Sequence, residues 1–136
     1  MDARPVKILL KSSIQSSQES FSYEGSCRRK GSLFCITYTD PSENTPTRVR
    51  IDAGPDGMTL HRRGAITARM EFCPDRDTDV KYKIDAFSAD FVLKTRTYSF
   101  SSDDSSIRIL TDYVLSDPSG EPVSENRQQM IITFKD

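Results

Sequence analysis

Hydrophobic and polar residues alternate along most of this chain with a period of two. The run from Met58 to Phe72 shows this best, because six of its eight even-numbered positions are apolar against one of its seven odd-numbered positions. Such alternation is typical of a strand with one buried face. The apolar phase is unchanged across Gly64, as in one continuous strand or in a hairpin with an odd-numbered loop. We expect one strand, bent at Gly64, because a straight strand of this length would span about 50 Å.

Eight further segments with the same alternation are predicted to be strands, and short polar turns connect them. The polar stretch SIQSSQES is expected to connect the first two strands. A two- or four-residue loop around Lys30 and Gly31 would place Tyr23 opposite Tyr38 in the hairpin that follows. The eight segments cover residues 6–14, 21–28, 32–39, 47–53, 80–84, 87–100, 107–115 and 123–134.

About nine strands joined by hairpin-length turns, with no segment of helical period, indicate an all-β fold. We expect a single antiparallel up-and-down meander, closed into a β-barrel of about 8–10 strands and forming one domain over residues 1–136. A β-sandwich is the alternative. The barrel is favoured because one long bent strand can belong to both halves of a barrel wall.

Composition narrows the function classes. The chain has 19 basic and 20 acidic residues, a net charge of −1, which argues against a nucleic-acid partner bound through phosphate neutralisation. No apolar run is long enough for a membrane span, and the N-terminus has no secretory signal pattern, so we expect no membrane partner. Three cysteines, an odd number, suit a reducing cytoplasm. With one histidine and no paired cysteine motif, neither a metal site nor a cofactor is expected.

The chain resembles the small bacterial YwiB-like family of unknown function, the DUF1934 group, over almost its whole length. The opening VKILLKSS is similar to the first strand of that family, and FSYEGSCRRKGSLFCITYTD to its first hairpin. Shorter motifs follow in the order of the family: Arg62-x-Gly64 with Met70 and Phe72, Leu93-x-Thr95, Tyr113-x-Leu115 and Ser124-x-Asn126. The resemblance implies a calycin-like, or lipocalin-like, barrel and supplies no activity.

Two positions depart from the pattern of the family. Ala86-Phe87-Ser88 stands where the family tends to have a turn with proline, an aromatic residue and glycine. Asp40 stands where it tends to have a glutamate after the third strand.

Arg62 is the sharpest candidate for a ligand-binding residue, since it lies on the apolar face of its strand. An inward arginine either binds an anionic or carbonyl group of a ligand or is satisfied internally as a polar plug that fixes register. Further polar residues are expected to face the same interior: Tyr23, Tyr38, Thr95, Tyr113, Ser124 and Asn126. They indicate either a small-molecule site or simply a filled core.

These residues support two hypotheses. In the first, a non-enzymatic cytoplasmic barrel binds a small, partly apolar ligand through Arg62 and the inner tyrosines. In the second, the barrel is filled and acts as a protein-interaction module through its outer wall or a homodimer, as outward apolar residues such as Leu110 and Val114 suggest. No catalytic pair is apparent, and an enzyme is a distant third. The outward residues Arg48, Arg50, Arg63 and Arg69 form either a basic stripe or an ordinary charged sheet face.

Overall fold

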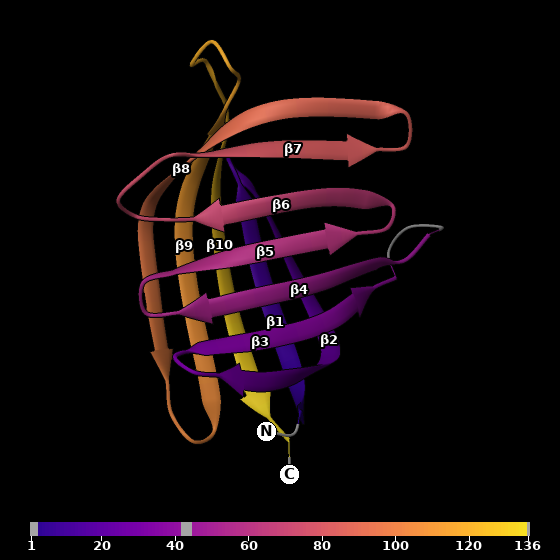
Figure 1. The fold of residues 1–136 in the computed structure, drawn as a ribbon, viewed down its shortest axis with the longest axis vertical. Coiled ribbons are helices and arrows are strands. Elements are labelled where there is room, and N and C mark those ends of the chain that lie inside the picture. Colours follow the sequence, from indigo (N-terminus) through magenta and orange to yellow (C-terminus); the bar gives the residue numbers. More distant parts are fainter. Residues whose placement is uncertain (1–2, 42–44, 136) are drawn as a thin grey trace.

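The computed structural model describes residues 3–41 and 45–135, which form ten strands in one antiparallel barrel (Figure 1). Each strand pairs with its neighbours in the chain, and β1 pairs with β10 to close the sheet. The strands are β1 (Arg4–Ile14), β2 (Ser17–Lys30), β3 (Leu33–Asp40), β4 (Thr47–Gly54), β5 (Gly57–Arg63), β6 (Ile66–Phe72), β7 (Thr78–Ile84), β8 (Phe87–Ser102), β9 (Ser106–Ser116) and β10 (Pro122–Phe134). The predicted up-and-down barrel is confirmed. Within the described ranges, no helix is long and apolar enough to cross a membrane.

Two long strands, β2 and β8, turn the corners of the barrel. The first part of β2 pairs with β1 and its last part with β3, while β8 pairs first with β7 and then with β9. The register of β8 shifts between Thr95 and Thr97, a bulge of the kind that bends a strand and increases its twist. In Figure 1, strands β3–β7 cross in front of β9, β10 and β1, which run more steeply, and β8 turns from the direction of β7 into that of β9.

The segment from Met58 to Phe72 is a hairpin, so the prediction of one continuous bent strand is wrong. Met58 lies opposite Phe72, and Arg62 lies opposite Ala68. Because the intervening loop has an odd number of residues, both halves bury the same face, as the unchanged apolar phase required. The chain reverses at Gly64, where an added Cβ would lie 2.2 Å from the carbonyl oxygen of Pro46. That close approach to the backbone before β4 excludes any side chain here.

The first two hairpins also differ in detail from the prediction. Strands β1 and β2 extend through most of the polar stretch and leave only a tight turn at Gln15 and Ser16. In the β2–β3 hairpin the two-residue turn lies at Gly31 and Ser32, because Gly31 adopts a left-handed φ of +60°. Register therefore shifts, and Tyr38 faces Gly25 instead of Tyr23.

The interior is filled along most of its length. The largest side chains that are less than 2% exposed come from nearly every strand: Phe72, Ile8, Ile36, Ile51, Met70, Leu93, Ile107, Ile109, Met130 and Ile132, with the smaller Val6 and Val80. Ten strands enclose a wider interior than eight, and large branched and aromatic residues occupy it. Of the two alternatives for the inward-facing residues, this part of the barrel corresponds to a filled core.

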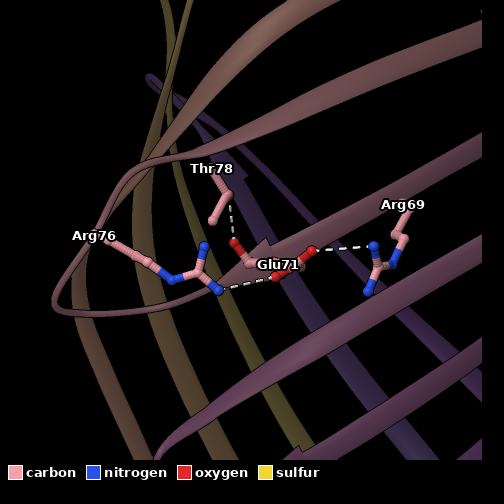
Figure 2. Close-up of polar contacts among 4 residues, drawn as sticks. All are labelled: Arg69, Glu71, Arg76 and Thr78. Atoms are coloured by element: carbon pink, nitrogen blue, oxygen red, sulfur yellow. Dashed lines mark hydrogen bonds and ion pairs between the residues drawn. The ribbon is translucent and has the colours of Figure 1, made fainter.

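The junction of β6 with β7 is the shortest in the sheet. Only Ile66 with Ile84 and Thr67 with Lys83 are in register. Farther along, side chains connect the strands, since the hydroxyl of Thr78 donates to the carbonyl oxygen of Glu71 at 2.7 Å. The Glu71 carboxylate also pairs with Arg69 at 3.1 Å and with Arg76 at 3.3 Å (Figure 2).

Tyr98 ties one end of the barrel together. Its hydroxyl on β8 donates to the carbonyl oxygen of Gly54 at 2.6 Å and lies 3.0 Å from that of Gly57. Both carbonyls belong to the β4–β5 turn, more than forty residues away in the chain. Burial raises the pKa of Tyr98, and the hydroxyl therefore remains a donor at neutral pH.

We expect Tyr98→Phe to lower the free energy of unfolding by about 1–2 kcal/mol, because it leaves two turn carbonyls without their donor. Urea unfolding measures the change. Tyr82→Phe is the matched control, since the acceptor of the Tyr82 hydroxyl within residues 3–41 and 45–135 is the sulfur of Met70, a weak acceptor, at 3.3 Å. Equal losses in the two variants would contradict a special role for Tyr98.

Candidate functional site

A cavity of about 170 Å³ lies at the other end of the barrel, and we call it the mouth cavity. It is formed where β3 and β5 end and where β4 and β6 begin, the opposite end of β4 from the Tyr98 tie. Its apolar wall consists of Leu10, Phe21, Val49 and Ile66. Its polar lining consists of Ser12, Tyr23, Tyr38, Asp40, Thr47, Arg62 and Gln128.

Arg62 lies near the end of β5 and points toward the interior, in phase with the buried Leu60 and Met58. Its side chain is half-buried, and no hydrogen bond or ion pair joins it to another residue of the described ranges. The expected inward orientation therefore holds, but the internal partner that a polar plug needs is missing among these residues. Because the side chain is only half-buried, solvent reaches the guanidinium, and a ligand with an acceptor group can take the place of that water.

Gln128 is the functional candidate that sequence reasoning missed. It is 7% exposed on β10, and its side-chain oxygen is buried with no hydrogen-bond partner among the described residues. Buried polar atoms in proteins nearly always have a partner, and an orphaned acceptor costs about 1–3 kcal/mol. The alternation along the sequence indicates this position, because it places Gln128 on the same inward face of the strand as Met130 and Ile132.

Two aromatic side chains stand beside Arg62. The rings of Tyr23 and Tyr38 are stacked with centroids 4.5 Å apart. Gly25 lies directly opposite Tyr38 and has no side chain to keep the two rings apart. This stacked pair forms a flat wall of the mouth cavity.

Burial keeps the inner tyrosines protonated. It raises the pKa of Tyr38 to about 12, although the nearby Arg62 charge opposes the shift. Burial is also the main cause of the raised pKa of Tyr23, and the Asp40 carboxylate, which accepts a hydrogen bond from Tyr23, adds to it. At neutral pH these phenols are therefore neutral hydrogen-bond donors and not bases.

The six predicted ligand-binding residues separate into two groups. Arg62, Tyr23 and Tyr38 meet at the mouth cavity. Thr95, Tyr113 and Asn126 are neighbours across β8, β9 and β10 but do not line that cavity. In this second group, Tyr113 packs edge-on against Phe72 with centroids 5.0 Å apart, and the Asn126 amide donates to the Ser124 hydroxyl at 3.0 Å.

The outer wall of β9 is less apolar at its surface than the alternation suggested. Val114 is only 5% exposed, and Leu110 is half-buried. The expectation that Val114 contributes to an exposed apolar face is therefore wrong. Within the described ranges no group of three or more histidine, cysteine or carboxylate side chains is placed to hold a metal ion.

The cysteines are unpaired. Cys27 points inward and Cys35 does not, as their opposite strand phases predict, and all three cysteines have free thiols. Burial raises the pKa of the Cys27 thiol to about 11. Since the thiolate is the reactive form, Cys27 is inert at neutral pH.

Comparison with known proteins supports the fold. The chain matches the profile of a family described as a domain of unknown function, DUF1934, over residues 8–130. Its fold is similar to the crystal structure of the ywiB protein from Bacillus subtilis, with a TM-score of 0.84, 17% sequence identity and coverage of 98% of this chain and 94% of that one. No curated protein gives a significant match.

The raised pKa of Tyr38 predicts a loss of stability at high pH. The folded state holds this proton more tightly than the unfolded state, whose phenol has the ordinary pKa of 10.0. The contribution of protonated Tyr38 to the free energy of unfolding is therefore complete below about pH 10 and is lost as the pH rises through about 12. Urea unfolding across this range should show a shallower decline in Tyr38→Phe than in the unaltered protein. Identical declines would mean that Tyr38 does not contribute.

Proposed function

Since the chain belongs to the DUF1934 family, whose function is unknown, we propose a function from the barrel mouth. The protein is a non-enzymatic, cytoplasmic binding module, and its mouth cavity holds a small, partly apolar ligand. The ligand carries an anionic or carbonyl group that Arg62 binds.

One observation carries this proposal. Two polar groups without partners in the described ranges, the Arg62 guanidinium and the side-chain oxygen of Gln128, line the same small cavity. Arginine only donates hydrogen bonds, and the Gln128 oxygen only accepts them. A ligand that presents an acceptor to Arg62 and a hydroxyl or amine donor to Gln128 would satisfy both.

The remaining walls set the size and character of the ligand. A volume of about 170 Å³ is below the usual range for drug-sized ligands. The cavity therefore takes a small molecule, or the polar head of a longer one. Phe21, Val49 and the stacked tyrosine pair would contact its apolar part. Because the interior beyond is filled, the ligand lies at the mouth and not deep in the barrel.

A non-enzymatic role is supported by the protonation of the groups around the cavity. The two mouth tyrosines keep their protons at neutral pH. The single histidine, His61, belongs to the outward-facing set of β5 and does not line the cavity. General acid–base catalysis works best with a group that titrates near neutral pH.

Native mass spectrometry of the purified protein tests the proposal by detecting a co-purified small molecule. Arg62→Leu should lose that molecule, with affinity reduced about ten-fold or more, since a charge-assisted hydrogen bond contributes about 1.5–3 kcal/mol. The same variant should unfold at an unchanged or higher temperature, because it removes an unpaired charge from an apolar edge.

Arg108→Leu, on the outer wall of β9, is the matched control and should retain the ligand. An Arg62→Leu protein that is equally stable and still carries the ligand would contradict the anchoring role of Arg62.

The alternative is an interaction module, and one exposed apolar site favours it. At the β7–β8 turn, Phe87 is 81% exposed, and its strand partner Ile84 is 46% exposed. Large exposed apolar side chains that lie together often mark contact sites. If this turn joins two copies, light scattering should report a dimer for the unaltered protein and a monomer for Phe87→Ser.

A further inference from the structure

A second hollow, of about 940 Å³, lies on the outer face of β2–β7, and we call it the basic groove. Apart from the inward-pointing Arg62, its lining contains six basic residues: Arg48, Arg50, Arg63, Arg69, Lys81 and Lys83. Among the described residues of the lining, Glu24 is the single acidic one. The whole chain has a net charge of −1, so positive charge is concentrated on this face.

The strand register brings like charges together in the groove. Arg48 on β4 lies directly opposite Arg63 on β5. In the next row, Arg50, His61 and Arg69 are successive neighbours across β4, β5 and β6. Like charges directly opposite on a sheet destabilise it. A sheet face without a binding role gains nothing from this arrangement.

Half of the basic residues are balanced by neighbouring carboxylates. Arg50 pairs with Asp52 at 3.0 Å, Arg69 with Glu71 at 3.1 Å (Figure 2), and Lys81 with Asp90 at 4.0 Å. The other three, Arg48, Arg63 and Lys83, form no ion pair with any residue of the described ranges. The acidic lining residue Glu24 pairs with Lys135. As far as the described ranges go, three positive charges of the groove therefore have no carboxylate partner.

We propose that the basic groove binds a multiply phosphorylated small molecule. A phosphate monoester carries close to two negative charges and three acceptor oxygens, so one such group can neutralise both Arg48 and Arg63. A carboxylate neutralises only one of them. Directly opposite residues have Cβ atoms within about 5.5 Å of each other, so the two long arginine side chains can reach one phosphate.

The rest of the lining agrees with a small phosphorylated molecule. Hydroxyls of Ser26 and Thr37, 2.9 Å apart, continue the row that contains Arg50 and can hydrogen-bond further acceptors. The volume lies within the range of small-molecule sites. Sites for single-stranded nucleic acid stack bases on Phe, Tyr or Trp rings, whereas the only such residue in the described part of this lining, Tyr38, points inward and is 8% exposed.

His61 provides a built-in reporter for this site. It is the single histidine of the chain and lies between Arg50 and Arg69. Burial, followed by the charges of Arg50 and Arg69, lowers its pKa, with Asp52 acting in the opposite direction and Arg63 adding to the decrease. A bound polyphosphate places negative charge beside the imidazole and should raise that pKa, which NMR titration of one unambiguous resonance measures.

Tripolyphosphate, titrated calorimetrically into the full chain at low salt, is the test ligand. Binding should weaken about ten-fold or more in Arg63→Gln and in Arg48→Gln, and the His61 pKa increase should shrink with it. Arg108→Gln, which removes an exposed arginine from β9, should bind as the unaltered protein does. Thermal unfolding without ligand should show both groove variants at least as stable as the unaltered protein, because each removes a like-charge contact.

Several results would overturn the proposal. These are an absence of tripolyphosphate binding, equal weakening in Arg108→Gln, and an unchanged His61 pKa at saturation. Tighter binding of a hexaglutamate peptide would assign the groove to an acidic protein segment, and tighter binding of a single-stranded oligonucleotide would assign it to nucleic acid. Should either arginine variant fail to fold, the exposed Lys83→Gln variant replaces it, with the same expected loss of affinity. The mouth cavity is unaffected by these substitutions, so either site can fail its test independently of the other.

Discussion

The pairing of β1 with β10 is the contact on which the rest of the structure depends. It extends from Val6 opposite Phe134 to Ile14 opposite Asn126 and turns a ten-stranded sheet into a barrel with no free edge. Once the sheet is closed, every second side chain of every strand enters one shared interior. Apolar residues can fill that interior, but each inward polar residue must find a partner, solvent or a ligand.

Closure also explains why the two ends of the barrel differ. At one end Tyr98 supplies the hydrogen bonds that two turn carbonyls need, and the rings of Phe34 and Phe100 lie 6.1 Å apart nearby. At the other end Arg62 and Gln128 have no such partners among the described residues. The hydrogen bonds at the Tyr98 end contribute to the stability of the fold. The mouth retains polar groups that do not stabilise the fold, so their presence needs another explanation.

On the outer face, the arrangement of charged residues shows the same contrast between groups with and without partners. In the β3–β7 wall, an acidic residue follows the arginine it neutralises by two positions on the same strand, as Asp52 does for Arg50. Arg48 and Arg63 instead face each other. The mouth and the basic groove are thus two separate places where the sequence departs from what folding by itself favours.

The sequence by itself determined the fold class and most of the inward-facing positions, because period-two alternation is a local property that each strand displays on its own. It also identified Arg62 as inward. It could not decide between a bent strand and a hairpin at Gly64, since an odd loop and a continuous strand leave the same phase.

The tertiary structure alone decided which strands meet. Neither the one-residue displacement of the β2–β3 turn nor the grouping of Arg62 with Gln128, on strands far apart in the chain, can be read from local pattern. The same holds for the Arg48–Arg63 contact, because register across a sheet is set by long-range pairing and by backbone approaches such as that of Gly64 to Pro46. Alternation fixes the side of the sheet on which a residue lies, and only closure of the barrel fixes its neighbours.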